Sequence, residues 1–536
     1  MRRVLLILAA LVAAAVAVVL GLGVLAPTPV PLSIVAGSEN KTLEPLLLDW
    51  AAKNGVAPTI TYLGSVDISR ELEKGTATAY DAVWPANSLW IALGDTGKVA
   101  KHSESILRSP VVLGLKKSIA QKLGWIGRQD VTVQMIAEAA SSHQFRLAMT
   151  SATQSNSGAS AYIGFLYAMA GNPDLLTMAN LNDPKVQDGV RKLLAQVDRS
   201  SGSSGWLKDS LVANPTAYDA MFNYESTVLE ADQALTAAGQ EPLYIIYPAN
   251  GLSVADSPLA YIDKGDATKE AAFLKLQTYL LSPETQKALS DLGRRSGLVG
   301  TEAQNPNPDV WKADWGADLK HDFAPVPTPG PDVIAEALTL YQTELRKPSL
   351  TVWVLDISGS MGGAPIEQLK QAMGLLLDKK AAAINLLQPS RRDVTIIIPF
   401  NDQVGQAIIV KGSADADLAA ALAQVNQLEA GGGTDLYGAL ATALQALQPY
   451  KDDGTLYTYL PAIVAMTDGA SDTTNFDYFN RVKADSGYGN DVPIHAIAFG
   501  EPDMAQLTAL TKESIGRLFT AGTDLAGALR QAKGYN

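Results

Sequence analysis

The chain has 536 residues, a length of about three domains, and its hydrophobic fraction of 47% and charged fraction of 18% are ordinary for a globular protein. The formal net charge of −13 argues against nonspecific binding of nucleic acid, which requires a basic surface. Cysteine is absent, which excludes disulfides, thiolate metal sites, cysteine nucleophiles and lipid-modified cysteines. The four histidines show no metal-ligand spacing, and we expect surface or packing roles for all of them: His102, His143, His321 and His495.

The N-terminal segment carries a targeting signal. Arg2 and Arg3 precede an uncharged, mostly apolar run, residues 4–26, which is long enough to cross the ~30 Å hydrocarbon core of a bilayer as a helix. Positive charge before the run predicts that the arginines stay in the cytoplasm and that the rest of the chain is extracytoplasmic. A proline-rich spacer completes residues 1–32, which we interpret as a transmembrane anchor and spacer.

A cleaved signal peptide is the alternative interpretation of the same run. Small residues end the run at Ala26, but Pro27 would follow the cut, where signal peptidases tolerate proline poorly. We therefore expect an uncleaved anchor. This predicts a single-pass protein of the cell membrane with the bulk of the chain outside the cytoplasm.

Residues 33–323 repeat a pattern in which a short apolar strand ends in small polar residues before a helix. The strands that show this pattern are Ser33–Ala36, Ile60–Leu63, Tyr80–Trp84 and Phe145–Thr150. The repetition is the layout of α/β ligand-binding lobes. Two further apolar stretches, Pro110–Leu115 and Leu243–Pro248, are expected to cross between two such lobes.

A serine-rich stretch, residues 151–158, follows the last of these strands and opens a helix. Hydroxyls and free backbone N–H groups at a helix start form a ready anion site. A simple serine cap is the alternative interpretation of the same residues.

The order of the polar stretches in this region resembles the type II bacterial extracytoplasmic solute-binding proteins, which have two α/β lobes joined by a double crossover and include molybdate- and phosphate-like binders. The stretches are Gly37-Ser38-Glu39-Asn40, Asp81 to Asn87, Ser155-Asn156-Ser157-Gly158, Tyr224-Glu225-Ser226 and Tyr247-Pro248. The resemblance implies an interlobe cleft for a small solute, and the residues implied to line it are Ser38, Ser65, Asn87, Ser157, Tyr224 and Tyr247. A carboxylate beside a bound oxyanion is costly. Glu39 and Glu225 therefore leave the charge of the solute open, and an amine or a metal-bearing ligand is an alternative.

Residues 324–348 are interpreted as a linker between domains. Ala324–Pro331 is rich in proline, which favours an interdomain hinge. A helix is expected over Asp332–Leu345, because apolar residues recur there at helical spacing, and Lys347-Pro348 ends it.

Strand and helix patterns alternate over residues 349–536, which predicts a doubly wound, Rossmann-like α/β sheet. The expected strands are Val352–Leu355, Val394–Phe400, Ile463–Thr467 and Val492–Phe499, with a short edge strand at Ile408–Val410. The expected helices are Ile366–Leu387, Leu418–Leu428, Leu436–Leu447 and Leu525–Ala532.

Oxygen-bearing side chains follow the strands of this region at the points where such a sheet binds its ligands. The first strand ends at Asp356 and is followed by Ser358 and Ser360; a glycine loop places Thr434 just before a helix; and a later apolar strand ends at Asp468. In open α/β sheets the ligand crevice lies beyond the carboxyl ends of the strands. A cluster of carboxylates and hydroxyls suits Mg²⁺ or Mn²⁺ rather than zinc.

The pattern Asp-x-Ser-x-Ser, then Thr, then Thr-Asp-Gly resembles the metal-ion-dependent adhesion site of von Willebrand factor A domains, and the resemblance covers residues 349–536. The metal ligands that it implies are Asp356, Ser358, Ser360, Thr434 and Asp468. It also implies a free coordination position that a carboxylate of a protein partner fills. In the alternative interpretation the two aspartates cap helix starts and the serines belong to a turn. Asp435, directly after Thr434, is an additional carboxylate that leaves the net charge of the site open.

These features predict a membrane-anchored extracytoplasmic binding protein that recognises a small solute between two lobes and a protein partner through a metal ion. A solute receptor of an ABC-type uptake system is one alternative. A metal-dependent hydrolase is another, but the sequence contains no nucleophile elbow, no His-Glu-x-x-His and no phosphate loop. Metal-assisted hydrolysis also needs a base, and none is evident, so we expect a protein that is not an enzyme.

Overall fold

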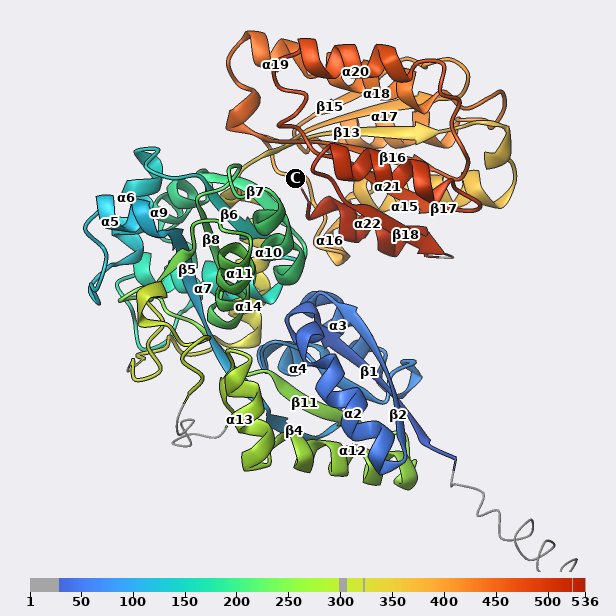
Figure 1. Cartoon of the computed structure of the whole chain (residues 1–536). Helices are drawn as coiled ribbons and strands as arrows, with labels where there is room; N and C mark the ends of the chain where they lie inside the picture. Colours follow the sequence, from blue (N-terminus) through green and yellow to red (C-terminus); the bar gives the residue numbers. More distant parts are fainter. Residues whose placement is uncertain (1–27, 298–305, 322, 523, 536) are drawn as a thin grey trace, which may run out of the picture.

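The computed structural model describes residues 28–297, 306–321, 323–522 and 524–535, and its strands form three sheets in three bodies (Figure 1). The expected transmembrane run, residues 4–26, lies outside the described residues. Within the described ranges, no helix has both the length and the apolar character needed to cross a membrane.

Lobe 1 is built on a five-stranded sheet. Its order is β2 (Val56–Leu63), β1 (Val30–Gly37), β3 (Ala82–Trp84), β11 (Pro258–Ile262) and β4 (Ala100–Ser105). Its helices are α2 (Glu44–Asn54), α3 (Ser65–Glu73), α4 (Leu89–Gly94), α12 (Ala267–Leu280) and α13 (Pro283–Asp291). Alternate residues of β1 face opposite sides: Ile34 packs with α2 and α12, and Val35 packs with α3. Both faces are therefore covered, as the near-continuous apolar run of β1 requires.

Lobe 2 is built on a seven-stranded sheet centred on a long strand, β5. The main order is β10 (Val254–Ala255), β5 (Leu107–Lys116), β8 (Ala220–Tyr224), β6 (Leu147–Thr150) and β7 (Val197–Ser201), and β9 (Leu243–Ile246) and β12 (Arg295–Ser296) also pair with β5. The helices are α5 (Lys117–Lys122), α6 (Val133–Ser141), α7 (Asn156–Met169), α8 (Met178–Leu181), α9 (Pro184–Leu194), α10 (Ser204–Ala213) and α11 (Glu225–Ala237). Helix α7 is almost wholly buried, which explains its apolar composition.

The chain crosses between the lobes at β4 to β5 and returns at β10 to β11. The two crossings run side by side, since the Ile106 backbone N–H donates to the Ser257 carbonyl over 3.2 Å. The prediction that Leu243–Pro248 forms the return crossing is wrong, because β9 pairs antiparallel with β5 inside lobe 2. Pro110–Leu115 likewise lies within β5, just after the first crossing. An apolar strand has the same local pattern in a sheet and in a crossing, and only its distant pairing partners distinguish the two.

The segment expected to be a hinge is packed against lobe 2. The Val326 backbone N–H donates to the Leu252 carbonyl over 2.8 Å. Helix α14 (Pro331–Leu340) continues as a π-helical turn, Tyr341–Leu345, and buries Ile334 in the core of lobe 2. The proline-rich segment is therefore fixed to lobe 2 by a hydrogen bond and by the helix that follows it.

The C-terminal domain, residues 349–535, is a six-stranded doubly wound sheet, as predicted. Its order is β15 (Ile408–Lys411), β14 (Val394–Phe400), β13 (Ser349–Asp356), β16 (Leu460–Thr467), β17 (Ile494–Phe499) and β18 (Leu518–Gly522), and only β15 is antiparallel to its neighbour. Along β13, Trp353 and Leu355 face one layer of helices, and Val352 and Val354 face the other.

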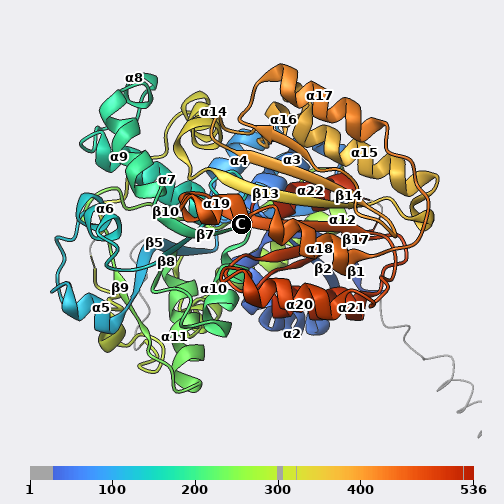
Figure 2. The ribbon, with the colours of Figure 1, turned by 90° about the horizontal axis from the view of Figure 1, so that it is seen from above.

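Helices cover both faces of this sheet (Figure 2). One layer contains α15 (Ala364–Leu377), α16 (Lys379–Ile384), α17 (Asp415–Asn426) and α22 (Leu525–Lys533). The other contains α18 (Leu436–Gln445), α19 (Gln448–Asp452), α20 (Phe476–Asp485) and α21 (Met504–Glu513). The single helix expected over Ile366–Leu387 is two helices, because Asp378 ends α15 and accepts a hydrogen bond from the Ala381 N–H to cap α16.

The C-terminal domain is docked on lobe 2. Three backbone carbonyls of this domain accept hydrogen bonds from side chains of lobe 2: Ile515 from Arg199 (2.6 Å), Arg530 from Gln154 (2.6 Å) and Gly534 from Ser200 (3.3 Å). Trp206 packs edge-on against Tyr535, with ring centroids 4.9 Å apart. Strand β13 starts near this seam and points away from lobe 2 (Figure 1).

Candidate metal centre and interlobe site

The predicted metal ligands gather at the switch point of the C-terminal sheet. Strands β13 and β16 are parallel neighbours in a register that pairs Leu355 with Met466, so Asp356 and Thr467 end their strands side by side. The sheet order runs outward in opposite directions from these two strands, and the crevice where a doubly wound sheet binds its ligand lies between them.

Four of the five predicted ligands are joined by hydrogen bonds. One Asp356 carboxylate oxygen accepts from the Ser358 backbone N–H over 2.8 Å. The Ser358 and Ser360 hydroxyls lie 3.1 Å apart, and Ser360 donates to Asp468 over 2.8 Å. Thr467, which was not predicted as a site residue, donates its hydroxyl to the other Asp356 oxygen over 2.6 Å.

Thr434, the fifth predicted ligand, belongs to the glycine loop beside these residues. The loop is tied to the serine loop twice: Gly359 N–H donates to the Gly432 carbonyl over 3.0 Å, and Gly431 N–H donates to the Ile357 carbonyl over 2.9 Å. Gly432 has a φ of 83°, and a Cβ there would lie 2.2 Å from Asp402 Oδ1. A glycine is therefore required for the loop to approach the crevice.

The additional carboxylate, Asp435, has a structural role. Its Oδ1 accepts from the Gly438 N–H over 3.0 Å at the start of α18, and its Oδ2 accepts from Asn475 over 2.6 Å. Helix capping, which the sequence left open for Asp356 and Asp468, thus applies to Asp435.

The donor set of the crevice fits a hard divalent cation. Asp356 is fully buried, and burial raises the pKa of its carboxyl group, with the nearby Asp468 acting in the same direction against hydrogen bonds from Thr467 and Ser358. Neither aspartate takes part in an ion pair among the described residues. Those residues also contain no group of three or more histidine, cysteine and acidic side chains that is placed to hold a metal. The crevice instead combines two carboxylates with hydroxyls, the oxygen set that Mg²⁺ and Mn²⁺ accept.

The four histidines lie outside the crevice. His102 contacts Glu270, His321 stacks on Tyr247, and His143 is exposed. His495 is buried, and its Nδ1 accepts from the Arg517 N–H over 2.9 Å. The histidines occupy surface and packing positions, as expected from their spacing.

The two lobes are closed on each other. Ser203 donates to Ser38 across the lobes over 3.1 Å, and Trp90 of lobe 1 donates to Asn156 of lobe 2 over 2.7 Å. A Cβ on Gly64 would lie 2.3 Å from the Gln154 carbonyl oxygen, so the backbones of the lobes touch there. Of the six predicted cleft residues, Ser38 takes part directly in this closure.

Ser157 and Tyr224 lie in a buried polar cluster of lobe 2. The Ser157 hydroxyl is 2.8 Å from both Thr150 and Ser204 hydroxyls. The Tyr224 hydroxyl accepts from the Asn156 amide over 3.1 Å, and burial raises the pKa of this tyrosine well above its usual value. Because Asn156 also bonds Trp90, the cluster is connected to lobe 1.

Ser65 and Asn87 have positions set by helix starts in lobe 1. Ser65 is buried as the first residue of α3. Asn87 accepts from the Leu89 N–H over 2.9 Å and donates to the Val254 carbonyl over 3.3 Å. The Asn87 side chain thus ties α4 to the return crossing.

The structure does not bring Tyr247 to the Ser157–Tyr224 cluster. Its hydroxyl donates to Glu225 and accepts from the Asp318 N–H over 3.2 Å. Glu225 is fully buried and forms a two-point ion pair with Arg295, at 2.7 and 2.8 Å. The charge of Glu225 is therefore balanced within the protein. Of the two glutamates that left the charge of the solute open, only Glu39 can still affect it.

Glu39 and Asn40 retain unpaired polar atoms next to the cleft. Oε1 of Glu39 and both side-chain polar atoms of Asn40 are buried without a hydrogen-bond partner. Burial raises the pKa of Glu39 to about 7. The negative charge of Glu39 also adds to the increase that burial causes in the pKa of Tyr224. Native proteins rarely leave such atoms unpaired, so they mark a place where a ligand or water can bind.

Two serines of lobe 2 were not predicted as site residues: Ser203, which bonds Ser38 across the cleft, and Ser204, which bonds Ser155 and Ser157 in the buried cluster. Their stretch, residues 200–205, is rich in serine and glycine between a strand and a helix, the same signal that drew attention to the other loops. The residues of the C-terminal domain beside the cleft had no such signal, because only the folded arrangement brings them there.

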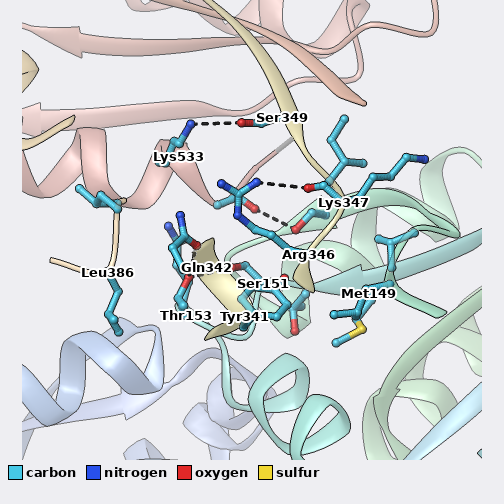
Figure 3. A pocket seen from close by; sticks show the side chains of 18 residues that line it. Met149, Ser151, Thr153, Tyr341, Gln342, Arg346, Lys347, Ser349, Leu386 and Lys533 are labelled. Atoms are coloured by element: carbon cyan, nitrogen blue, oxygen red, sulfur yellow. Dashed lines mark hydrogen bonds between the residues drawn. The ribbon is translucent and has the colours of Figure 1, made fainter. Parts of the chain in front are cut away.

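A small cavity lies in the seam between lobe 2 and the C-terminal domain (Figure 3). Its volume of about 30 Å³ is enough for about one water molecule. Lys533 approaches Ser349 over 3.4 Å, and Arg346 is ion-paired with the buried Asp393. Burial lowers the pKa of Lys533 to about 8. This cavity is a polar gap in an interface, too small for a solute.

Comparison with known proteins gives two family matches along the chain. Residues 32–295 match the family described as bacterial extracellular solute-binding protein, and residues 351–470 match the von Willebrand factor type A domain. The human inter-alpha-trypsin inhibitor heavy chain H6 is 30% identical in an alignment of 191 residues that covers 33% of this chain. The match spans only 14% of the length of that relative.

Similar solved structures are more distant. A von Willebrand factor type A structure from Catenulispora acidiphila is 17% identical, covers 36% of this chain and 43% of its own chain, and has a TM-score of 0.30. The apo ferric ion-binding protein A of Pasteurella haemolytica is 14% identical, covers 58% of this chain and 96% of its own, and has a TM-score of 0.43.

Proposed function

Because the chain joins a bacterial extracellular solute-binding protein domain to a von Willebrand factor type A domain, we propose that it is a two-ligand receptor. In this proposal the lobes bind a small solute between them, and the C-terminal domain binds a protein partner through a metal ion. The single observation that carries the metal half is the hydrogen-bonded chain from Asp356 through the two serines to Asp468 at the sheet's switch point.

The proposed metal ligands are the five residues of the crevice. These are Asp356, Ser358, Ser360, Thr434 and Asp468. Mg²⁺ or Mn²⁺ held there would supply an electrophilic centre for a carboxylate of the partner. The protein's contribution is to hold two buried carboxylates and the hydroxyls at one point, with Thr467 fixing one oxygen of Asp356.

The direction of β13 supports a role in partner binding. The seam with lobe 2 lies at the start of this strand, and the crevice lies at its other end (Figure 1). A partner that docks at the crevice therefore does not compete with lobe 2 for the same surface.

The solute half of the proposal is supported by the buried, unpaired polar atoms of Asn40 and of Glu39, whose charge acts on Tyr224. The N-terminal apolar run supports anchoring in the cell membrane, with the lobes and the C-terminal domain outside the cytoplasm. Uptake through a transporter is the alternative use of the same solute-binding domain.

The test of the metal half is isothermal titration of Mg²⁺ and Mn²⁺ into the full chain in detergent. We expect binding by the wild type and its loss in Asp356→Ala. The matched control is Asp417→Ala, which removes an exposed aspartate from the first turn of α17. This variant should bind both metal ions as the wild type does. Equal affinity in Asp356→Ala and the wild type would refute this half.

A further inference from the structure

A cavity of about 230 Å³ lies where both lobes and the C-terminal domain meet. Lobe 1 contributes Ser38 and Lys41, lobe 2 contributes Ser203 and Trp206, and the C-terminal domain contributes Arg517 and Tyr535. Ser38 and Ser203 form one of the contacts that close the cleft, so the cavity lies at the mouth of the interlobe site. The C-terminal domain forms its third wall.

The carboxylates of this cavity are already paired, whereas its cations are not. Asp67 is ion-paired with Arg70 over 3.3 Å, and Asp209 is ion-paired with Lys208 over 3.0 Å. Among the residues that the structure describes, neither Lys41 nor Arg517 forms an ion pair. The cavity therefore presents uncompensated positive charge.

Arg517 is held in place by aromatic side chains. Its guanidinium lies 4.9 Å from the Phe519 ring centroid and 4.8 Å from that of Tyr535, and it donates to the Tyr535 hydroxyl. Burial lowers the pKa of Arg517 to about 10, which still leaves it charged at neutral pH. A fixed guanidinium is a strong donor to carboxylates and phosphates.

Two further arginines add positive charge behind the wall. Arg199 is 2% exposed, lies 5.5 Å from the Trp206 ring centroid, and has a buried Nε without a hydrogen-bond partner. Arg530, next to Gln531 of the cavity wall, also has a buried Nε without a partner. Neither forms an ion pair within the described ranges. In a chain of net charge −13, such a group of unpaired cations requires an explanation.

Aromatic rings supply the apolar part of the wall. Tyr62, Trp206 and Tyr535 line the cavity from the three bodies in turn. Tyr62 is fixed by donating to Glu44 over 3.1 Å. Few polar groups set among aromatic rings are typical of a small-molecule site.

We propose that this cavity binds a small organic anion, a carboxylate or a phosphate with a compact apolar body, and that Arg517 of the C-terminal domain is one of its ligands. The inference deepens the proposed function, since it rests on solute binding at the interlobe cleft and names the charge of the solute. It also makes the C-terminal domain part of the solute site.

An anion in this cavity would couple the three bodies. Lobe 2 and the C-terminal domain are already joined by hydrogen bonds and by the Trp206–Tyr535 contact. Lobe 1 instead faces the C-terminal domain across the cavity, where the like charges of Arg70 and Arg530 interact unfavourably. A bound anion between Lys41 and Arg517 offsets that repulsion and draws lobe 1 toward the C-terminal domain.

The test is anion binding by the full chain in detergent, measured by isothermal titration and thermal unfolding. The probes are inorganic phosphate, sulfate, citrate and benzoate, with choline and glucose as cationic and neutral counterparts. We expect at least one anion to bind and to raise the melting temperature. Lys41→Gln and Arg517→Gln should each weaken anion binding at least about tenfold, the loss of affinity expected when one hydrogen bond to a charged group is removed.

The controls are exposed lysines away from the cavity. Lys53→Gln in lobe 1 and Lys512→Gln in the C-terminal domain lower the net charge equally and should bind as the wild type does. Arg517→Lys keeps the charge and should retain part of the affinity if the variant chain is folded. The proposal is overturned if no anion binds, if only choline or glucose binds, or if Lys41→Gln and Arg517→Gln both bind as the wild type does.

Tyr224→Phe separates this inference from the proposed function. If Tyr224→Phe abolishes anion binding and Arg517→Gln leaves it intact, the solute lies wholly between the lobes and the third wall is refuted. If Arg517→Gln abolishes binding and Tyr224→Phe leaves it intact, the three-walled cavity stands, and the buried interlobe cluster is not the solute site.

Discussion

Thr467 donates its hydroxyl to Asp356 over 2.6 Å, from the last residue of one strand to the last residue of its neighbour. The bond occupies one carboxylate oxygen and fixes the rotamer of Asp356, so that the other oxygen and the serine hydroxyls face the same crevice. In the proposed metal site, Thr467 would orient Asp356 from behind, as hydrogen-bonded neighbours orient metal ligands.

Thr467→Val should weaken metal binding without unfolding the domain. Valine keeps the shape of threonine but removes the donor to Asp356, and loss of such a supporting bond typically costs about 10–100-fold in metal affinity. Titration of Mn²⁺ into the full chain measures this. Thr508→Val on the exposed side of α21 removes a hydroxyl that bonds its own helix and is the control. An unchanged Mn²⁺ affinity in Thr467→Val would show that the bond does not orient the site.

Gly432→Ala should disturb the protein more than Gly454→Ala, although the two glycines have similar backbone conformations. Both Gly432 (φ 83°) and Gly454 (φ 78°) are in the left-handed region, but only at Gly432 would an added Cβ meet other atoms, with Asp402 Oδ1 at 2.2 Å. Gly454→Ala should therefore cost about 1 kcal/mol from backbone strain alone. Gly432→Ala should cost more in urea unfolding and also weaken metal binding. Equal costs with intact metal binding would contradict this account of the loop.

Arg295→Met should strongly destabilise the solute-binding domain. It leaves Glu225 buried without its partner, and breaking a buried pair in this way costs about 3–5 kcal/mol. Lys287→Met, in the exposed pair with Asp291, should change the stability by less than about 1 kcal/mol. Urea unfolding of both variants gives the comparison.

Tyr247→Phe should leave solute affinity unchanged, because the Tyr247 hydroxyl contacts Glu225 and Asp318 rather than the cleft cluster.

Lys533 should make the protein more stable as the pH rises. Burial lowers its pKa from 10.5 to about 8 in the folded state, so between these values the unfolded chain binds more protons than the folded chain. Stability from this group therefore increases from about pH 8 to pH 10.5. Lys533→Met should remove that increase and stabilise the protein at neutral pH, whereas the exposed Lys512→Met should do neither. A pH profile of urea unfolding that is identical in Lys533→Met and the wild type would show that the ammonium is not buried.

The sequence was sufficient to predict that Asp356, Ser358, Ser360 and Asp468 come together in one crevice, because these residues follow local signals. Asp356 and Asp468 come directly after apolar strands, and the carboxyl ends of parallel strands in a doubly wound sheet meet at one edge. The two strands, β13 and β16, are paired in the sheet. Thr467 was missed because its side chain acts on a residue 111 positions away, which no local pattern reveals.

The interlobe site was less accessible to sequence reasoning. The strand-to-polar-loop pattern gave the two lobes, but Tyr247 belongs to a buried cluster with Glu225 and Arg295 that forms only through long-range contacts. No local sequence pattern predicted that the C-terminal domain forms the third wall of the cavity. Arg517 and Tyr535 reach the cleft because the seam between lobe 2 and the C-terminal domain places them there.

Anomalous diffraction from crystals of the protein grown with Mn²⁺ would locate a metal ion in the crevice directly. We predict one strong anomalous peak in the crevice, bounded by Asp356, Ser358, Ser360, Thr434 and Asp468, and its disappearance in Asp356→Ala crystals. A map without a peak in the crevice, or a peak that persists in Asp356→Ala, would contradict the claim that these residues form a metal site.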